Sequence, residues 1–213
     1  MIELMRSAAL TSFPELARSL GLDPDSLLAA AGIDRRALAD PDMRIPVEYV
    51  GDLLEIAAEQ SGVEAFGLRL AETRQISIIG PIGLLLREEA TVGDAFRSAC
   101  RYISLHNEAI SFRLEKVEDQ AVIQGGVHLA RRRPYRQGVE LTLAVLYRVL
   151  AQLIGPQWRP LVCIAHDPPV RRDVHHRVLG PRVDFRCNYN GLIFPWSDLE
   201  RPVPGADPAF AKQ

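Results

Sequence analysis

Between residues 110 and 154 the hydrophobic period changes from two to about 3.6 residues, and this change constrains the fold most. Ile110, Phe112 and Leu114 alternate with polar residues, and alternation resumes after a Glu118-Asp119 turn at Ala121, Ile123, Val127 and Leu129. The pattern predicts a β-hairpin. From about residue 135 to 154, an apolar stripe of Val139, Leu143, Leu146, Val149, Leu150 and Leu153 predicts a long helix. A hairpin and a helix that are each apolar on one face are expected to pack together.

Shorter patterns complete the predicted fold. Helices are expected near residues 12–21, 23–32, 34–41, 46–61, 63–73, 91–107 and 170–179, and a turn at Gly80-Pro81-Ile82-Gly83. Residues 161–165, apolar on both faces, read as a central strand, and short strands at 183–187 and 192–194 flank the Asn188–Gly191 turn. The sequence therefore predicts an α+β fold, an antiparallel sheet of about five strands covered by helices, with a helical N-terminal part.

Composition along the chain divides it into three parts. Residues 1–42 are expected to form a helical segment, which ends near Pro41. Residues 43–201 are expected to form the α+β domain. Residues 202–213 have the composition of a linker, with prolines at 202, 204 and 208.

Bulk properties exclude several classes of protein. The apolar fraction is 47% with no apolar run long enough to cross a membrane and no signal-peptide core, so a cytoplasmic location is expected. Three widely spaced cysteines, Cys100, Cys163 and Cys187, favour reduced thiols over a disulfide framework. The net charge of −2 makes no general case for nucleic acid. All but two of the 25 cations are arginines, so a buried anion would meet a guanidinium.

Leu16 to Ile33 mimics a helix-turn-helix unit, but its charges oppose DNA binding. Asp23 and Asp25 stand at the start of the second helix, where a groove-reading helix needs cations and polar groups. A structural helical pair is the preferred interpretation.

Two basic clusters allow more than one interpretation. Arg131-Arg132-Arg133 with Arg136 suits a phosphate, a carboxylate or a DNA-binding module, although a solvated loop is the commoner role for such a run. The cluster at residues 171–177 is expected on an exposed helix face. Cys163 and His166 would point to opposite faces of a strand, so no metal site is predicted. No cofactor motif and no catalytic motif is present.

Four polar side chains suggest a ligand site. Tyr102 and His106 lie one helical turn apart, and His128 ends the second hairpin strand close to the start of the first. Arg136 begins the long helix. We expect a pocket between the 91–107 helix, the hairpin and the 135–154 helix, with Tyr102, His106, His128 and Arg136 at its margins. The alternative is that the two histidines are hydrogen-bonded interface residues.

The order of several short motifs resembles the N-terminal, arabinose-binding-like effector domain of AraC-family transcription regulators. The matching segments are Gly21-Leu22-Asp23-Pro24, Ala31-Gly32-Ile33-Asp34, Phe66-Gly67-Leu68-Arg69, Gly80-Pro81-Ile82-Gly83, Ala90–Phe96, Arg101-Tyr102, Arg136-Gln137 with Glu140, Gly180–Phe185 and Asn190–Phe194. The predicted strands do not suit the jelly-roll barrel of the sugar-binding members.

The resemblance implies a bacterial sensor domain that binds a small-molecule effector and is able to form a homodimer. In the family a linker and a helix-turn-helix DNA-binding module follow, and this chain stops at Gln213. DNA binding is therefore expected only through that absent module. The rival interpretation is a free-standing small-molecule carrier or interaction domain, and catalysis is not expected.

Overall fold

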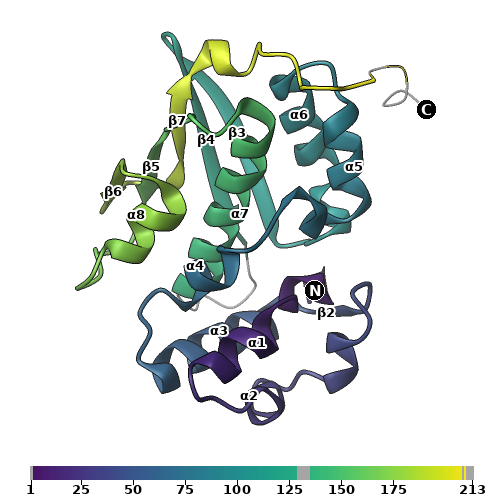
Figure 1. The fold of residues 1–213 in the computed structure, drawn as a ribbon, viewed down its shortest axis with the longest axis vertical. Helices are drawn as coiled ribbons and strands as arrows, with labels where there is room; N and C mark the ends of the chain where they lie inside the picture. Colours follow the sequence, from purple (N-terminus) through teal and green to yellow (C-terminus); the bar gives the residue numbers. More distant parts are fainter. Residues whose placement is uncertain (1, 129–134, 208, 210–213) are drawn as a thin grey trace.

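The computed structural model describes residues 2–128, 135–207 and 209, and it has a five-stranded sheet at one side (Figure 1). The strand order is β3-β4-β7-β5-β6, and every neighbouring pair is antiparallel except β5 with β6. The strands are β3 (Ile110–Val117), β4 (Gln120–Val127), β7 (Asn190–Pro195), β5 (Leu161–Ile164) and β6 (Val183–Phe185). The predicted α+β class is confirmed.

Helices cover one face of this sheet and extend below it. The α-helices are α1 (Phe13–Ser19), α2 (Pro24–Ala30), α3 (Val47–Ser61), α4 (Phe66–Ala71), α5 (Pro81–Glu88), α6 (Val92–Tyr102), α7 (Arg136–Ile154) and α8 (Asp173–Leu179). Five short 3₁₀ turns lie among them, at Ser7–Leu10, Arg35–Leu38, Ile76–Ile79, Ile103–Leu105 and Trp196–Asp198. A small second sheet pairs β1 (Leu4–Arg6) with β2 (Arg44–Pro46), which the sequence did not predict.

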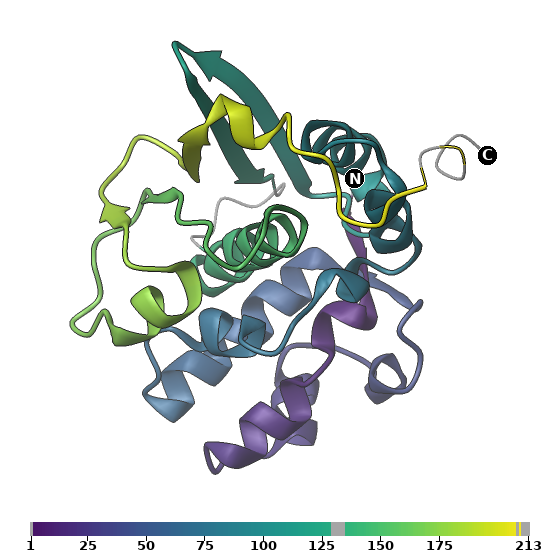
Figure 2. The same ribbon diagram turned by 45° about the horizontal axis from the view of Figure 1, so that its top comes forward.

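The long helix α7 is the centre of the molecule. Figure 2 shows it with the β3–β4 hairpin on one side, α3 and the N-terminal helices on the other, and α6 and α8 flanking it. By length and composition α7 is the one described helix that could cross a membrane, but 56% of it is buried inside the fold. It is therefore a core helix, and the apolar core is continuous from Met5 to Val203.

Several predicted helix ends are confirmed by their hydrogen bonds. Asp23 caps α2 by accepting from the backbone N–H groups of Asp25 and Ser26, and Thr91 caps α6 by accepting from Asp94. Gly62 ends α3 with a φ of 67°, a left-handed conformation that favours glycine. The capping box at Ser12 does not form, because Ser12 itself has a left-handed backbone (φ 65°) and its side chain caps nothing.

Two local predictions are wrong. The segment from Gly80 to Gly83 is the start of α5, where Pro81 occupies the first turn of a helix, rather than a separate turn. The strands at 183–185 and 190–195 do not form a hairpin, because β5 lies between them in the sheet. β5 pairs in parallel with β6, and α8 connects the two strands. This pairing depends on tertiary packing, so the turn residues in the sequence do not predict it.

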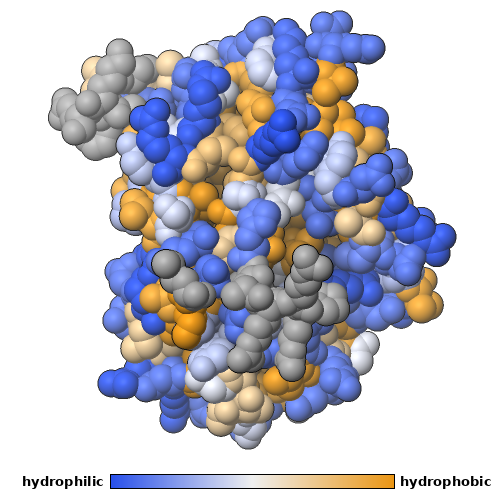
Figure 3. Space-filling view, turned by 180° about the vertical axis from the view of Figure 1, so that it is seen from behind, coloured by the Kyte–Doolittle hydropathy of each residue, from blue (hydrophilic) through white to orange (hydrophobic). Residues whose placement is uncertain are grey.

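The surface mixes apolar and polar residues. Seen from behind, hydrophobic residues lie in small groups among hydrophilic ones (Figure 3). The large apolar side chains that are exposed, such as Leu84, Leu105 and Val170, lie in different parts of the chain. The described residues hold no disulfide; Cys163 is buried, and Cys100 and Cys187 are partly buried.

Candidate ligand cavity

An apolar cavity of about 80 Å³ lies where α6, β3 and α7 meet, between the three elements that the sequence singled out. Its walls are aliphatic and aromatic side chains from α6, the turn after it, β3 and α7, closed by residues from the N-terminal part and α5. They include Ala99, Ile103, Ile110, Phe112, Leu141, Val145, Leu146, Val149, Met5, Ile79 and Leu86. The polar members are Arg74, His106, Asn107 and Thr142. An apolar chamber with a few polar groups is the usual form of a small-molecule site.

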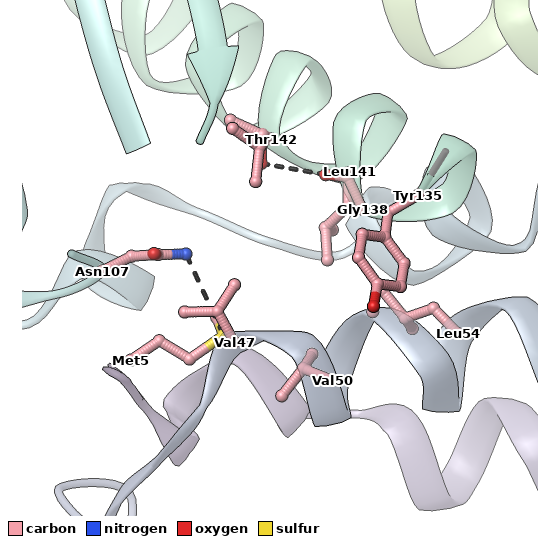
Figure 4. Close-up of a pocket in the computed structure, with 11 residues that line it drawn as sticks. Met5, Val47, Val50, Leu54, Asn107, Tyr135, Gly138, Leu141 and Thr142 are labelled. Atoms are coloured by element: carbon pink, nitrogen blue, oxygen red, sulfur yellow. Dashed lines mark hydrogen bonds between the residues drawn. The ribbon is translucent and has the colours of Figure 1, made fainter. Parts of the chain in front are cut away.

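A second cavity of about 40 Å³ adjoins the first, and the two share Met5, Asn107, Leu141 and Thr142 as lining residues. Figure 4 shows Asn107, Val47 and Thr142 reaching toward this space from three different parts of the chain. The Asn107 amide nitrogen donates to the Met5 sulfur at 3.9 Å, a weak acceptor. The Thr142 hydroxyl donates to Gly138 O at 2.9 Å within α7. Asn107 therefore retains most of its donor capacity at the junction of the two cavities.

His106 is the predicted site residue that lines the larger cavity. It is 8% exposed, and its Nδ1 is buried without a hydrogen-bond partner. Burial first, and then the positive charges of the neighbouring arginines 6, 74 and 44, lower the pKa of His106 to about 4. The ring is therefore neutral at pH 7, with one nitrogen that donates and one that accepts a hydrogen bond.

Arg74 is the cation of this cavity, and the sequence analysis missed it. Its side chain follows α4 and is 6% exposed. Burial lowers the pKa of Arg74 to about 10, so the guanidinium still carries its charge at pH 7. Neither its neighbours nor its spacing distinguish this arginine from the others in the sequence, so no local pattern signals its burial.

The other three predicted site residues do not line the cavity. Tyr102 is partly buried beside the Arg101 guanidinium, whose carbon lies 6.0 Å from the ring centroid. His128 is exposed, and its Nε2 lies 2.8 Å from the Ser111 hydroxyl. Arg136 belongs to a separate polar cluster. The structure thus places one of the four, His106, on the cavity wall.

That polar cluster surrounds Glu140, which is fully buried in the second turn of α7. One carboxylate oxygen, Oε1, lies 3.0 Å from His175 Nε2, 2.9 Å from His166 Nε2 and 3.1 Å from Arg136 Nε. Burial alone would raise the pKa of Glu140, but the bonds from the two histidines, with the His175 and Arg136 charges, outweigh it and lower this pKa.

Phe185 packs against the rings of His175 and His166 at centroid distances of 5.2 and 5.9 Å. The cluster therefore joins separate parts of the chain. No group of acidic, histidine and cysteine side chains with metal-binding geometry occurs in the part of the chain that the structure describes. Arg136 therefore supports α7 and α8 rather than the cavity. Arg131, Arg132 and Arg133 lie outside the described residues.

Comparison with known proteins identifies the family to which this chain is similar. Residues 21–203 match the arabinose-binding N-terminal domain of AraC transcription regulators. The HTH-type transcriptional regulator VirS of Mycobacterium tuberculosis is 28% identical over 208 residues, and the ornithine utilization regulator of Pseudomonas aeruginosa is 24% identical over 208 residues. These matches cover 96% and 97% of this chain and 61% of each relative.

A solved structure shows the same fold. The transcriptional regulator CdpR from Pseudomonas aeruginosa superposes with a TM-score of 0.63 at 17% identity, covering 92% of this chain and 59% of that one. The family match spans most of the chain, so this protein belongs to the arabinose-binding N-terminal domains of AraC transcription regulators. The chain spans about three fifths of the length of these curated relatives, both of which are named as regulators.

Proposed function

We propose that this domain is an effector sensor, which binds a small molecule in the cavity between α6, β3 and α7. The observation that supports it is the position of α6. Its last turns contribute Ala99 to the cavity wall, with Ile103 just beyond its end, while its first turn holds the segment by which the chain leaves the domain. One rigid helix therefore connects the cavity with the outgoing chain.

Backbone hydrogen bonds hold that outgoing segment on α6. Gly93 N donates to Leu199 O at 2.8 Å, and Val92 N donates to Arg201 O at 3.0 Å. Further along, Val203 N donates to Ala90 O at 3.3 Å. A shift of α6 on ligand binding would move residues 199–203 with it.

In the full-length protein this segment is proposed to lead into a helix-turn-helix DNA-binding module, with residues 202–213 as the start of the linker. The effector acts by binding one arrangement of α6 more tightly than the other, since only differential affinity shifts such an equilibrium. A homodimer and a cytoplasmic location are part of the same proposal, and light scattering at about 100 μM tests the dimer.

The cavity lining argues for an effector with an apolar body. One relative is named for ornithine utilization, but ornithine carries two ammonium groups, and no carboxylate is among the residues that line the cavity. Desolvating ammonium groups against aliphatic walls is costly without a partner. We therefore do not propose ornithine for this chain.

Native mass spectrometry of the gently purified domain tests the proposal, because it detects a co-purified small molecule directly. Ala99→Leu places a larger side chain in the cavity, and we expect it to remove the bound molecule while the fold is retained. Ala151→Leu is the matched control, since Ala151 is a partly buried α7 residue outside the cavity lining. Equal retention of the molecule in both variants would place its site elsewhere.

A further inference from the structure

We infer that the effector is a small monocarboxylate, with an apolar body about the size of one aromatic ring and a carboxylate that binds Arg74. This inference rests on the proposed function of the cavity and adds the charge and size of its ligand. It is carried by the guanidinium of Arg74, which lines the cavity without any acidic partner among the described residues.

The hydrogen bonds of Arg74 leave its charge uncompensated. Nη2 donates to Ala9 O and, at 3.5 Å, to Thr11 O, whereas Nε is buried with no partner. Two less buried arginines nearby have carboxylate partners: Arg6 pairs with Asp42, and Arg44 with Glu108. A buried charge without a counter-ion is costly, and buried guanidinium groups are normally paired.

A role in closing the Ser7–Leu10 turn does not explain why residue 74 is an arginine. That role uses two carbonyl oxygens and one nitrogen, and it requires no positive charge. An anion in the cavity would supply what the described residues lack. Guanidinium and carboxylate match in geometry, because two parallel N–H groups meet two oxygens.

His106 supplies a further donor beside Arg74. Both residues line the same cavity, and the charge of Arg74 is one of those that act on the His106 ring. The unpaired Nδ1 of the neutral ring is able to donate to a carboxylate oxygen. Arg74 and His106 are two of the four polar residues in a lining that is otherwise apolar.

Arg74 also lines a depression on the surface of the protein. A surface depression of about 400 Å³, lined by Arg6, Thr11, Ser12, Thr73, Gln75 and Ser77 among others, borders the cavity region. Of the described residues that line the depression or the cavity, Arg74 alone lines both. A carboxylate entering from this side reaches Arg74 at the threshold, and its apolar body continues inward.

The cavity volume sets the size of the body. The two adjoining cavities measure about 80 and 40 Å³. An engineered cavity of about 150 Å³ in another protein binds benzene. Even together the two cavities are smaller than that one, so a single ring is the largest body that fits, and it requires some outward movement of the walls. A phosphate is less suitable than a carboxylate, because the few donors here would leave a dianion largely unpaired.

Calorimetric titration of the purified chain with benzoate and with benzamide tests the inference, since the two probes have nearly the same shape and differ in charge. We expect benzoate to bind about tenfold more tightly or better, as is typical for hydrogen bonds to a charged group. Arg74→Gln should abolish this preference, and Arg74→Lys should keep part of it. Arg97→Gln is the control, because Arg97 lies on α6 outside the cavity and pairs with Asp94.

The outcomes separate this inference from the proposed function. Equal binding of both probes, blocked by Ala99→Leu, would overturn the carboxylate and leave the cavity as the ligand site. Absence of binding by either probe at millimolar concentration would overturn both. The comparison in the unmodified protein decides the inference even if Arg74→Gln does not fold.

Discussion

At the scale of single residues, two buried ionisable groups differ in whether a side chain of opposite charge accompanies them. Glu140 is surrounded by His166, His175 and Arg136, so its charge is compensated within the protein. Arg74 has carbonyl partners but no acidic one among the described residues. The first arrangement joins α7, α8 and the segment that follows β5, and the second is the one to which we assign a ligand carboxylate.

His106 makes stability depend on pH. The folded pKa of about 4 lies below the ordinary value of 6.5, so the unfolded chain binds a proton that the folded protein does not. The stabilisation from the neutral ring is complete above pH 6.5 and is lost as the pH falls toward 4. We expect the free energy of unfolding to drop by about 2 kcal/mol between pH 7 and pH 5.

Urea denaturation at these two pH values measures the drop. His106→Gln should remove most of it, because glutamine does not titrate. His176→Gln is the control, since His176 is exposed and should leave the pH dependence unchanged. A drop that persists in His106→Gln would assign the acid sensitivity to another group.

At the scale of elements, α4 and α7 lie so close together at Gly67 that a side chain at this position would not fit between them. Gly67 N donates to Gln137 Oε1 at 2.9 Å, and a Cβ added at Gly67 would lie 2.1 Å from the Gln137 carbonyl oxygen. The close approach fixes α7 over α4 and so fixes the cavity wall that α7 provides.

Gly67→Ala should therefore destabilise the protein by about 2–3 kcal/mol, although alanine is the better helix former. Gly138→Ala is the matched control on α7, because its added Cβ would meet only the Tyr135 Cβ at 3.7 Å. There we expect no loss, or a gain of up to about 1 kcal/mol. Thermal unfolding of both variants checks the pair, and similar melting temperatures would contradict the packing argument.

At the scale of the whole molecule, the fold is that of an AraC-family N-terminal domain, and its N-terminal helical pair is unsuited to reading DNA. The pair α1–α2 mimics a helix-turn-helix, but Leu27 and Leu28 of α2 are buried in the core. Asp23 is committed to capping α2, and Asp25 adds a second negative charge at the same end. The face that would enter a groove is thus either buried or acidic.

The chain of residues 1–213 should show no sequence-selective binding to duplex DNA at physiological salt, because the helices that the structure describes offer no suitable basic face for reading a groove. Selection from a random duplex library followed by sequencing is the measurement. A full-length protein that continues beyond residue 213 is the control, and it should enrich one motif. Enrichment by the shorter chain alone would contradict this expectation.

The sequence by itself determined the elements whose signals are local: the hairpin from its period of two, α7 from its stripe, and the caps at Asp23 and Thr91 from their side chains. It also indicated the three elements that enclose the cavity, and His106 among its lining residues. Tertiary structure decided the rest. It placed β5 between β6 and β7 in the sheet. It also brought together residues that are far apart in the chain: Arg74 with His106 in the cavity lining, and Glu140 with His166 and His175. Burial and electrostatic pairing of such residues depend on the packed fold, and no local pattern in the sequence reports them.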